Sequence, residues 1–196
     1  MSSTEIDTNS RILAETWRLM EQKRGQGVRI QDIAKAAGIS RQAVYLHFPS
    51  RVELLVETTR YVDKALCVNE RFQEYCAAKN GVERLEGYVD FWGNYIPQIY
   101  GLAKALMVAQ ETDEDAATAW QLRMKDVRDG CCSVIDELVR EKALALQWTT
   151  TEAVDMMWTL LMIPNWENLT LRCGWSQEQY IRWIKTSLKR LLIGGK

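Results

Sequence analysis

Polar and basic side chains at residues 40–47 form the part of the sequence whose residue types and spacing could do chemistry. Two turns of one expected short helix carry Ser40, Arg41, Gln42, Tyr45 and His47. These side chains donate and accept hydrogen bonds in the way that contacts to base edges and phosphates in the DNA major groove require. The pattern therefore favours recognition of a nucleic acid over a chemical reaction.

Enzymatic chemistry has no visible support in the chain. His47 is the only histidine, so neither a second histidine nor a cysteine cluster completes a metal site. No serine or cysteine has a partner base, and no glycine-rich phosphate loop is present. We therefore expect no enzyme activity, no cofactor and no metal ion.

The cellular location is inferred from the cysteines and from the absence of long apolar runs. Five cysteines without a CxxC spacing indicate reduced thiols, and the adjacent Cys131 and Cys132 leave a thiol sensor as an alternative. No apolar run reaches the roughly 18 residues that a membrane span needs. The polar first ten residues do not resemble a secretory signal. These features predict a cytoplasmic protein without a membrane partner.

Two short helices with a tight turn must position the polar cluster. We expect one helix from Ile30 to Ala37, a turn at Gly38, and a second helix over residues 41–47 that Ser40 caps. Small or apolar residues occupy the positions where the two helices must touch, namely Ile33, Ala34, Ala37, Ile39 and Val44. This arrangement is a helix-turn-helix pattern, and its alternative is an ordinary helical hairpin in a bundle.

The rest of the chain also has helical periodicity, and no segment alternates as a strand does. Pro49 breaks the chain and Ser50 caps a long helix, while Pro97 interrupts one later helix and Pro164 kinks another. The expected helices are 7–22, 50–79, 82–96, 99–110, one from about 113, 150–173 and 177–193. The sequence therefore predicts an all-α protein.

Charge is distributed unevenly along the chain, although the net charge is only −1. Residues 1–51 contain eight basic and five acidic residues, a net of +3, and the remainder has a net of −4. A surface that binds phosphates is expected in the basic segment. This charge argues against a protein-interaction module whose hairpin never touches DNA, for which a neutral or acidic segment is expected.

The stretches IQDIAKAAGIS and YLHFPSR, at residues 30–40 and 45–51, resemble the TetR family of transcriptional regulators. The resemblance covers about residues 8–60. It implies a three-helix helix-turn-helix DNA-binding domain at residues 1–51, linked by the helix 50–79. A larger α-helical domain for ligand binding and dimerisation follows at residues 52–196. It also implies a homodimer that binds a palindromic double-stranded operator.

The resemblance also assigns roles to the DNA-binding residues. Arg41 and Gln42 read base edges, and Gln31 contacts a base or a phosphate. Ser40 and Ala43 lie at the groove surface, Phe48 belongs to the core, and Tyr45, His47 and Arg51 contact phosphates. Arg29 stands where many members have a threonine that caps the second helix, so we expect the cap to be supplied differently here, and contact of Arg29 with a phosphate is the alternative role.

A small-molecule effector is expected in the larger domain, which contains seven of the eight tryptophans. The resemblance places the pocket within residues 82–170. Candidate lining residues are Trp92, Tyr95, Met107, Trp120, Met124, Trp158, Met162 and Trp166. Each of them also fits an ordinary core position. Because few charges fall on the inward faces, we expect a hydrophobic or aromatic ligand, and the alternative is a cationic ligand held by tryptophan faces.

The last two helices are expected to pair with their copies in a second subunit. Their apolar face carries Trp183, Ile184, Leu188 and Leu191, and pairing through it gives a twofold symmetric dimer. The expected function is repression that the ligand relieves, with activation left open. A small helical enzyme that uses the tryptophan-rich cavity is the remaining alternative, and only Glu167, Asp90 and Glu111 offer it acid–base groups.

Overall fold

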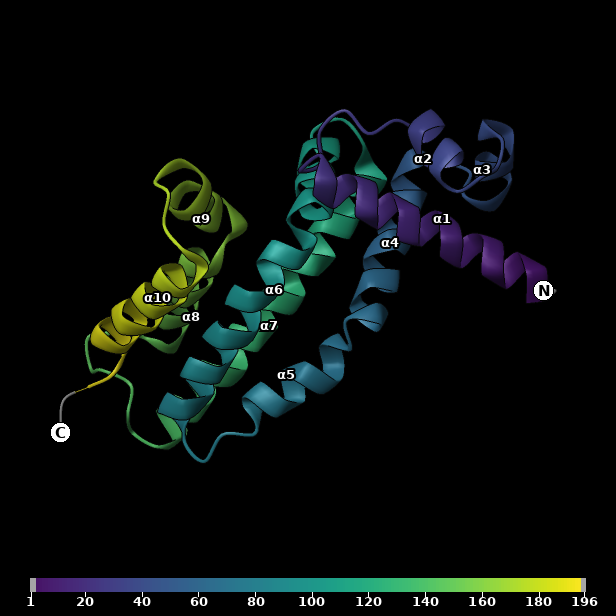
Figure 1. The fold of residues 1–196 in the computed structure, drawn as a ribbon. Helices are drawn as coiled ribbons and strands as arrows, with labels where there is room; N and C mark the ends of the chain where they lie inside the picture. The colour runs from purple at the N-terminus through teal and green to yellow at the C-terminus, as the bar shows by residue number, and fades with distance from the viewer. Residues whose placement is uncertain (1–2, 195–196) are drawn as a thin grey trace. The chain divides into compact units, whose positions relative to one another are not determined.

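The computed structural model describes the backbone of residues 3–194 and the side chains of residues 8–74 and 77–194. Within this part of the chain the structure is helical, without a named strand, and the all-α prediction is confirmed (Figure 1). No described helix is long and apolar enough to cross a membrane. The helices are α1 (Ser3–Gln22), α2 (Ile30–Ala36), α3 (Arg41–His47), α4 (Arg51–Ala65), α5 (Val68–Cys76), α6 (Gly81–Ala109), α7 (Glu114–Arg140), α8 (Thr150–Leu161), α9 (Ile163–Trp166), the π-helix η1 (Glu167–Arg172) and α10 (Gln177–Leu192).

The chain divides into two compact units, and α6 and α7 each contribute to both. The first unit comprises Met1–Val68 and Gln98–Leu122, and the second comprises Asn69–Pro97 and Arg123–Lys196. The first unit therefore holds the helix-turn-helix segment together with the end of α6 and the start of α7. The functional boundary after residue 51 stays a prediction.

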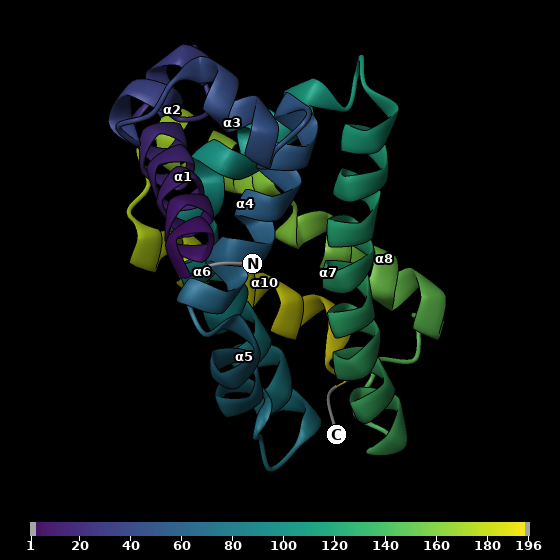
Figure 2. The same ribbon diagram turned by 90° about the vertical axis from the view of Figure 1, so that its right-hand side faces the viewer.

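In the first unit, α1 packs against α2 and α4, and α2 packs against α3 (Figure 2). Ile12 and Met20 of α1 are completely buried, as are Ile33 of α2 and Val44 of α3. The burial of these apolar side chains is the main favourable term that holds such short helices together. The α3 helix is therefore presented by a packed support.

The end of α1 is attached to α6 by a set of contacts that we name the α1–α6 joint. The Trp17 indole Nε1 donates a hydrogen bond to the Gln98 carbonyl at 3.0 Å. The Glu21 carboxylate accepts from the backbone N–H groups of Gly101 at 2.9 Å and Leu102 at 3.0 Å. Burial raises the pKa of Glu21, although these two hydrogen bonds oppose the shift. The carboxylate thus binds backbone donors of a helix far away in the sequence.

Close backbone approach at the joint requires glycine at Gly25 and Gly101. A Cβ added to Gly101 would lie 2.1 Å from the Met20 carbonyl oxygen, and one added to Gly25 would lie 2.3 Å from the Gly101 oxygen. Gly25 also has a φ of +74°, in the region that side chains with a Cβ rarely adopt. The two backbones are therefore in direct contact, without side chains between them.

The predicted interruption at Pro97 is wrong, because α6 runs through it from Gly81 to Ala109. A proline inside a helix leaves the carbonyl four residues earlier without its backbone donor. Here that carbonyl belongs to Gly93, and the Gln177 side-chain amide donates to it. A residue of the last helix thus supplies the hydrogen bond that Pro97 cannot make.

The predicted continuous helix 50–79 is also wrong. The α4 helix ends at Ala65, Cys67 has a φ of +48°, and α5 begins at Val68. In the second unit the Phe72 ring on α5 packs edge-on against Tyr88 and Phe91, with centroids 5.8 and 5.4 Å away. We attribute the break to this packing, because the local sequence contains neither glycine nor proline.

The predicted kinked helix 150–173 is divided into three pieces instead. The α8 helix stops at Leu161, Met162 has an extended backbone, and α9 starts at Ile163. Pro164 then lies in the first turn of α9, where its missing N–H costs no helical hydrogen bond. The following residues, Glu167–Arg172, form a π-helix.

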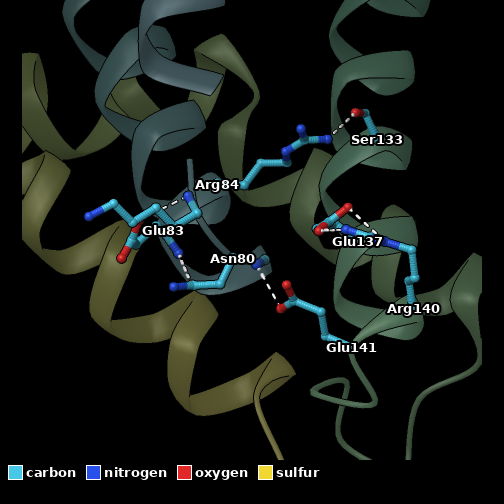
Figure 3. Close-up of polar contacts among 9 residues, drawn as sticks. Asn80, Glu83, Arg84, Ser133, Glu137, Arg140 and Glu141 are labelled. Atoms are coloured by element: carbon cyan, nitrogen blue, oxygen red, sulfur yellow. Dashed lines mark hydrogen bonds and ion pairs between the residues drawn. The ribbon is translucent and has the colours of Figure 1, made fainter. Parts of the chain in front are cut away.

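In the second unit, the start of α6 is held to the end of α7 by polar contacts (Figure 3). The Asn80 side chain accepts from the Glu83 N–H at 2.9 Å, which caps α6, and the Gly81 N–H donates to the Glu141 carboxylate at 2.8 Å. Arg84 donates to the Ser133 hydroxyl at 3.3 Å. The charged side chains of Arg84 and Glu141 therefore have structural partners.

The adjacent cysteines on α7 differ in their surroundings. Cys131 is completely buried, whereas Cys132 is half-buried. Burial raises the pKa of the Cys131 thiol to about 12, so its reactive thiolate is scarce at neutral pH. Cys131 is therefore poorly suited to a thiol sensor.

Candidate nucleic-acid interface

The α2 helix begins without the threonine cap that the resemblance implies. Arg29 is the N-cap residue, and its backbone N–H donates to the Asp32 carboxylate at 3.0 Å. This hydrogen bond, together with the Arg29 side chain, lowers the pKa of Asp32. Asp32 thus supplies the reciprocal half of a capping box, while the Asp32 N–H donates to the Arg29 backbone carbonyl at 2.9 Å instead of to a cap side chain, and the Arg29 side chain stays 76% exposed.

The turn between α2 and α3 is built from local signals in the sequence. Gly38 has a φ of +67°, and the Ile39 N–H donates to the Ala34 carbonyl at 3.0 Å. This is the closure that a glycine after a helix end commonly provides. The Ser40 hydroxyl then accepts from the Ala43 N–H at 3.1 Å and caps α3. The helix-turn-helix geometry is therefore present as predicted.

The outer face of α3 carries most of the predicted DNA-binding side chains. Val44 and Phe48 point into the core, whereas Arg41 and Gln42 are exposed and Tyr45 is 37% exposed. The Arg41 guanidinium lies over the Tyr45 ring, 5.6 Å from its centroid. This cation–π contact limits the conformational freedom of the Arg41 side chain, which the sequence predicts to contact a base edge.

The other predicted DNA-binding residues lie around this face. Gln31 on α2 and Ser40 are exposed, although the Ser40 oxygen already accepts the cap hydrogen bond. Ala43 and His47 are half-buried. Sequence reasoning assigned no role to Leu46, which is 85% exposed on the same helix. The signal available in the sequence was its spacing, because Leu46 follows Gln42 by four residues and so shares its helix face.

Arg51 has a different position from the one expected of a phosphate contact. Its guanidinium Nη1 donates to the Val28 carbonyl at 2.7 Å, and the side chain is partly buried. Burial also lowers the pKa of Arg51. Arg51 thus joins the start of α4 to the segment before α2, which is a structural role.

We expect Arg51→Ala to lower the free energy of unfolding by about 1–3 kcal/mol, because the buried Val28 carbonyl loses a charged donor. Thermal unfolding measures this change, with the exposed Arg41→Ala as a control that leaves the midpoint unchanged. An unchanged midpoint for Arg51→Ala, combined with a weaker salt dependence of DNA binding, would restore the phosphate role.

The predicted ligand-binding residues fall in both units. In the second unit, Trp92 and Trp166 are buried, and their indole nitrogens donate to the Leu161 carbonyl and the Gln177 side chain. Tyr95 is buried against Trp92, with ring centroids 5.9 Å apart. The remaining three residues of this unit are half-buried, namely Met124, Trp158 and Met162. In the first unit, Trp120 is buried and Met107 is half-buried.

A groove between α6 and α10 in the second unit has a different lining. Its volume is about 640 Å³, and none of the eight predicted ligand-binding residues lines it. Lys185 pairs with Asp90 at 2.5 Å, and Lys189 pairs with Glu86 at 2.6 Å. The groove is therefore crossed by ion pairs that join the two helices.

Two of the four predicted dimer residues lie in the wrong place for an interface. Ile184 and Leu188 are completely buried within the chain, where α10 packs against α8, so they have no surface to offer a partner. Trp183 and Leu191 are 39% and 37% exposed. The apolar face of α10 is thus largely used by its own subunit.

The geometry of residues 28–51 defines a class of protein, namely an all-α protein with a helix-turn-helix DNA-binding motif. Residues 12–58 match the family model of bacterial regulatory proteins of the tetR family. The N-terminal part of the chain is therefore similar to the DNA-binding domain of the TetR family.

Individual relatives agree with this assignment. The regulator EthR of Mycolicibacterium smegmatis is 42% identical over 50 residues, which cover 26% of this chain and 23% of EthR. The nucleoid occlusion factor SlmA of a Marinomonas species is 25% identical over 149 residues, 74% of this chain and 72% of that protein. A transcriptional regulator from Saccharomonospora viridis in complex with choline has the same fold. Its TM-score is 0.79 at 18% identity, over 96% of this chain and 99% of that one.

Proposed function

We propose that this protein is a ligand-responsive repressor that binds a palindromic operator as a homodimer and is released by a small hydrophobic or aromatic molecule. The observation that carries the proposal is the outer face of α3, where exposed Arg41 and Gln42 stand on a capped helix within a segment of net charge +3. Arginine and glutamine pair with the major-groove edges of guanine and adenine. In a dimer, two such helices enter successive major grooves about 34 Å apart.

Two buried donors in the second unit support a ligand that carries a hydrogen-bond acceptor. The Tyr180 hydroxyl and the Trp158 Nε1 have no hydrogen-bond partner among the described residues. Burial raises the pKa of Tyr180, so its hydroxyl stays protonated and available as a donor. Unsatisfied buried donors are costly, and an acceptor on an aromatic ligand would remove that cost.

A cationic ligand is the second candidate, because the regulator from Saccharomonospora viridis was crystallised with choline. Trp158 already has a cation over its ring, since the Arg128 guanidinium lies 5.7 Å from the ring centroid. Among the described residues, the fully buried polar side chains are Thr16 and Thr58, and neither is a carboxylate. A buried cation would therefore lack a fully buried counter-charge, which favours the neutral ligand.

Tyr180→Phe separates a ligand-binding role of this hydroxyl from a packing role. We expect the free energy of unfolding to stay the same or rise by up to about 1 kcal/mol, because the variant removes an unsatisfied buried group. The effector concentration that releases half of the DNA is expected to rise roughly tenfold, which corresponds to about 1.4 kcal/mol of lost binding. Tyr61→Phe, in the first unit, is the control. An unchanged effector response in Tyr180→Phe would remove Tyr180 from the site.

The route from ligand to DNA that we propose runs through α6 and α1, because the expected continuous helix 50–79 is absent. The α6 helix carries Trp92 and Tyr95 in its first part and the joint residues Gly101 and Leu102 in its second part. The Glu21 carboxylate attaches those backbone groups to α1, which packs on the motif. A coupling free energy of about 1–3 kcal/mol would suffice for a useful switch.

The dimer interface that we propose uses the apolar side chains still exposed at the end of the chain. The exposed Trp183, Leu191 and Leu171 belong to it, together with the half-buried Trp175, whose ring contacts Trp183 edge-on at 5.8 Å. Replacing both Trp183 and Leu191 with glutamate is expected to give a monomer in analytical ultracentrifugation, because buried charges oppose association. Leu146→Glu changes a fully exposed leucine and serves as the control. An intact dimer in the double variant would exclude this interface.

A binding selection against random duplex DNA at two salt concentrations tests the function directly. We expect an enriched inverted repeat whose binding weakens steeply as salt rises, since phosphate contacts release counterions. The Arg41→Ala, Gln42→Ala double variant is the matched control and should lose the enrichment. If well-folded wild-type dimer enriches no sequence after bound small molecules have been removed, the proposed function is contradicted.

A further inference from the structure

Among the described residues of the first unit, Leu46 is the most exposed large apolar side chain, at 85%. Leu46 does not contribute to the packing of α3, because Val44 and Phe48 fill the core beneath the helix. These two side chains are 0% and 5% exposed. An isolated exposed leucine needs no explanation on an ordinary surface. Leu46, however, lies on the helix that carries Arg41 and Gln42, so its chemistry bears on what that helix recognises.

The position of Leu46 along α3 places it in a row with Gln42. Residues four apart lie on the same face of a helix, about 6 Å apart along its axis. Arg41 and Tyr45 form the neighbouring row, which their cation–π contact holds together. Base pairs in DNA are about 3.4 Å apart, so the two members of a row reach bases about two steps from each other. Leu46 is thus spaced to meet a base other than the one that Gln42 meets.

The major groove offers one apolar group to such a side chain. A leucine cannot hydrogen-bond to phosphates or to base edges, whereas the C5-methyl group of thymine is a regular apolar contact in that groove. On the basis of the proposed function, we propose that Leu46 contacts a thymine methyl group and fixes the base at one position of each operator half-site. Leu46 is then a specificity-determining residue whose recognition is apolar.

The test uses the full-length protein and the operator found by the selection. Each thymine is replaced in turn by deoxyuridine, which lacks only the methyl group. For the wild type we expect a loss of affinity of about three- to tenfold at one position of each half-site, the scale of burying one or two carbon atoms. Leu46→Ala should bind the unmodified operator more weakly and show no further loss at that position. Its sensitivity at other positions should be unchanged.

Controls separate this outcome from other causes. Leu146→Ala removes a fully exposed leucine outside the motif and should give the wild-type profile. Restoring the methyl group as 5-methylcytosine, paired with guanine at the sensitive position, should recover affinity in the wild type relative to plain cytosine and not in Leu46→Ala. Identical deoxyuridine profiles for the wild type and Leu46→Ala would overturn the inference while operator binding stands. Absence of any operator binding would overturn the proposed function and the inference together.

Discussion

Gly101→Ala is expected to lower the free energy of unfolding by about 2 kcal/mol or more, which corresponds to a fall in the melting temperature of roughly 4–8 °C for a chain of this size. Helix propensity alone predicts the opposite sign, because alanine is favoured over glycine inside a helix by about 1 kcal/mol. The added Cβ, however, would lie 2.1 Å from the Met20 carbonyl oxygen and 2.5 Å from its carbon. Both are backbone atoms, so no rotamer change can relieve the overlap.

Thermal and denaturant unfolding followed by circular dichroism measure this effect. Val108→Ala, an exposed position seven residues later in α6, is the control and should stay within about 0.5 kcal/mol of the wild type. We also expect Gly101→Ala to weaken operator binding, because the α1–α6 joint supports the helices that pack behind α3. A melting temperature equal to or above that of the wild type would show that the two backbones separate at little cost.

Arg41→Ala is expected to weaken specific operator binding by about 1–3 kcal/mol, or roughly 5- to 150-fold in the dissociation constant. The loss has two origins, namely one positive charge near phosphates and the forked donor that pairs with a guanine edge. Arg41→Lys separates them, because lysine keeps the charge without the fork. We expect Arg41→Lys to retain the salt dependence of the wild type and to lose base preference.

Titrations of the selected operator and of a scrambled duplex measure both quantities. Arg190→Ala removes the same charge from α10, outside the motif, and should leave the ratio of the two affinities unchanged. Tyr45→Phe keeps the ring beneath Arg41 and is expected to have a smaller effect than Tyr45→Ala. Equal affinity of Arg41→Ala and the wild type for the operator would exclude the groove assignment.

The helix-turn-helix segment could be predicted from the sequence because its signals are local. Gly38 adopts the positive φ that the turn requires, and Ser40 caps the helix that follows, as predicted. Proline at position 49 marked the end of α3. Each of these residues determines the backbone conformation of its immediate neighbours, so the local sequence is sufficient to predict the turn and the two helices.

The errors arose where a distant residue decides the local structure. Gln177 completes the hydrogen bonding around Pro97 from 80 residues away, and Phe72 packs on rings that follow it in α6. The position of Arg51 depends on the Val28 carbonyl, which no spacing rule predicts. The apolar face of α10 contains the buried Ile184 and Leu188 as well as exposed apolar residues. Sequence periodicity identifies this face, but it does not tell which of its residues pack in the core and which remain for an interface.

The glycine contact at the α1–α6 joint has a genetic consequence. Because Gly25 and Gly101 exclude any side chain, most single-nucleotide changes in either codon should inactivate the regulator without altering a DNA-contacting residue. On the proposed repression, a random library selected for constitutive expression of a reporter behind the operator should therefore contain alleles of codons 25 and 101 as well as alleles that change α3. Codon 101 lies 50 codons beyond residue 51, the last residue of the helix-turn-helix motif that such alleles would disable.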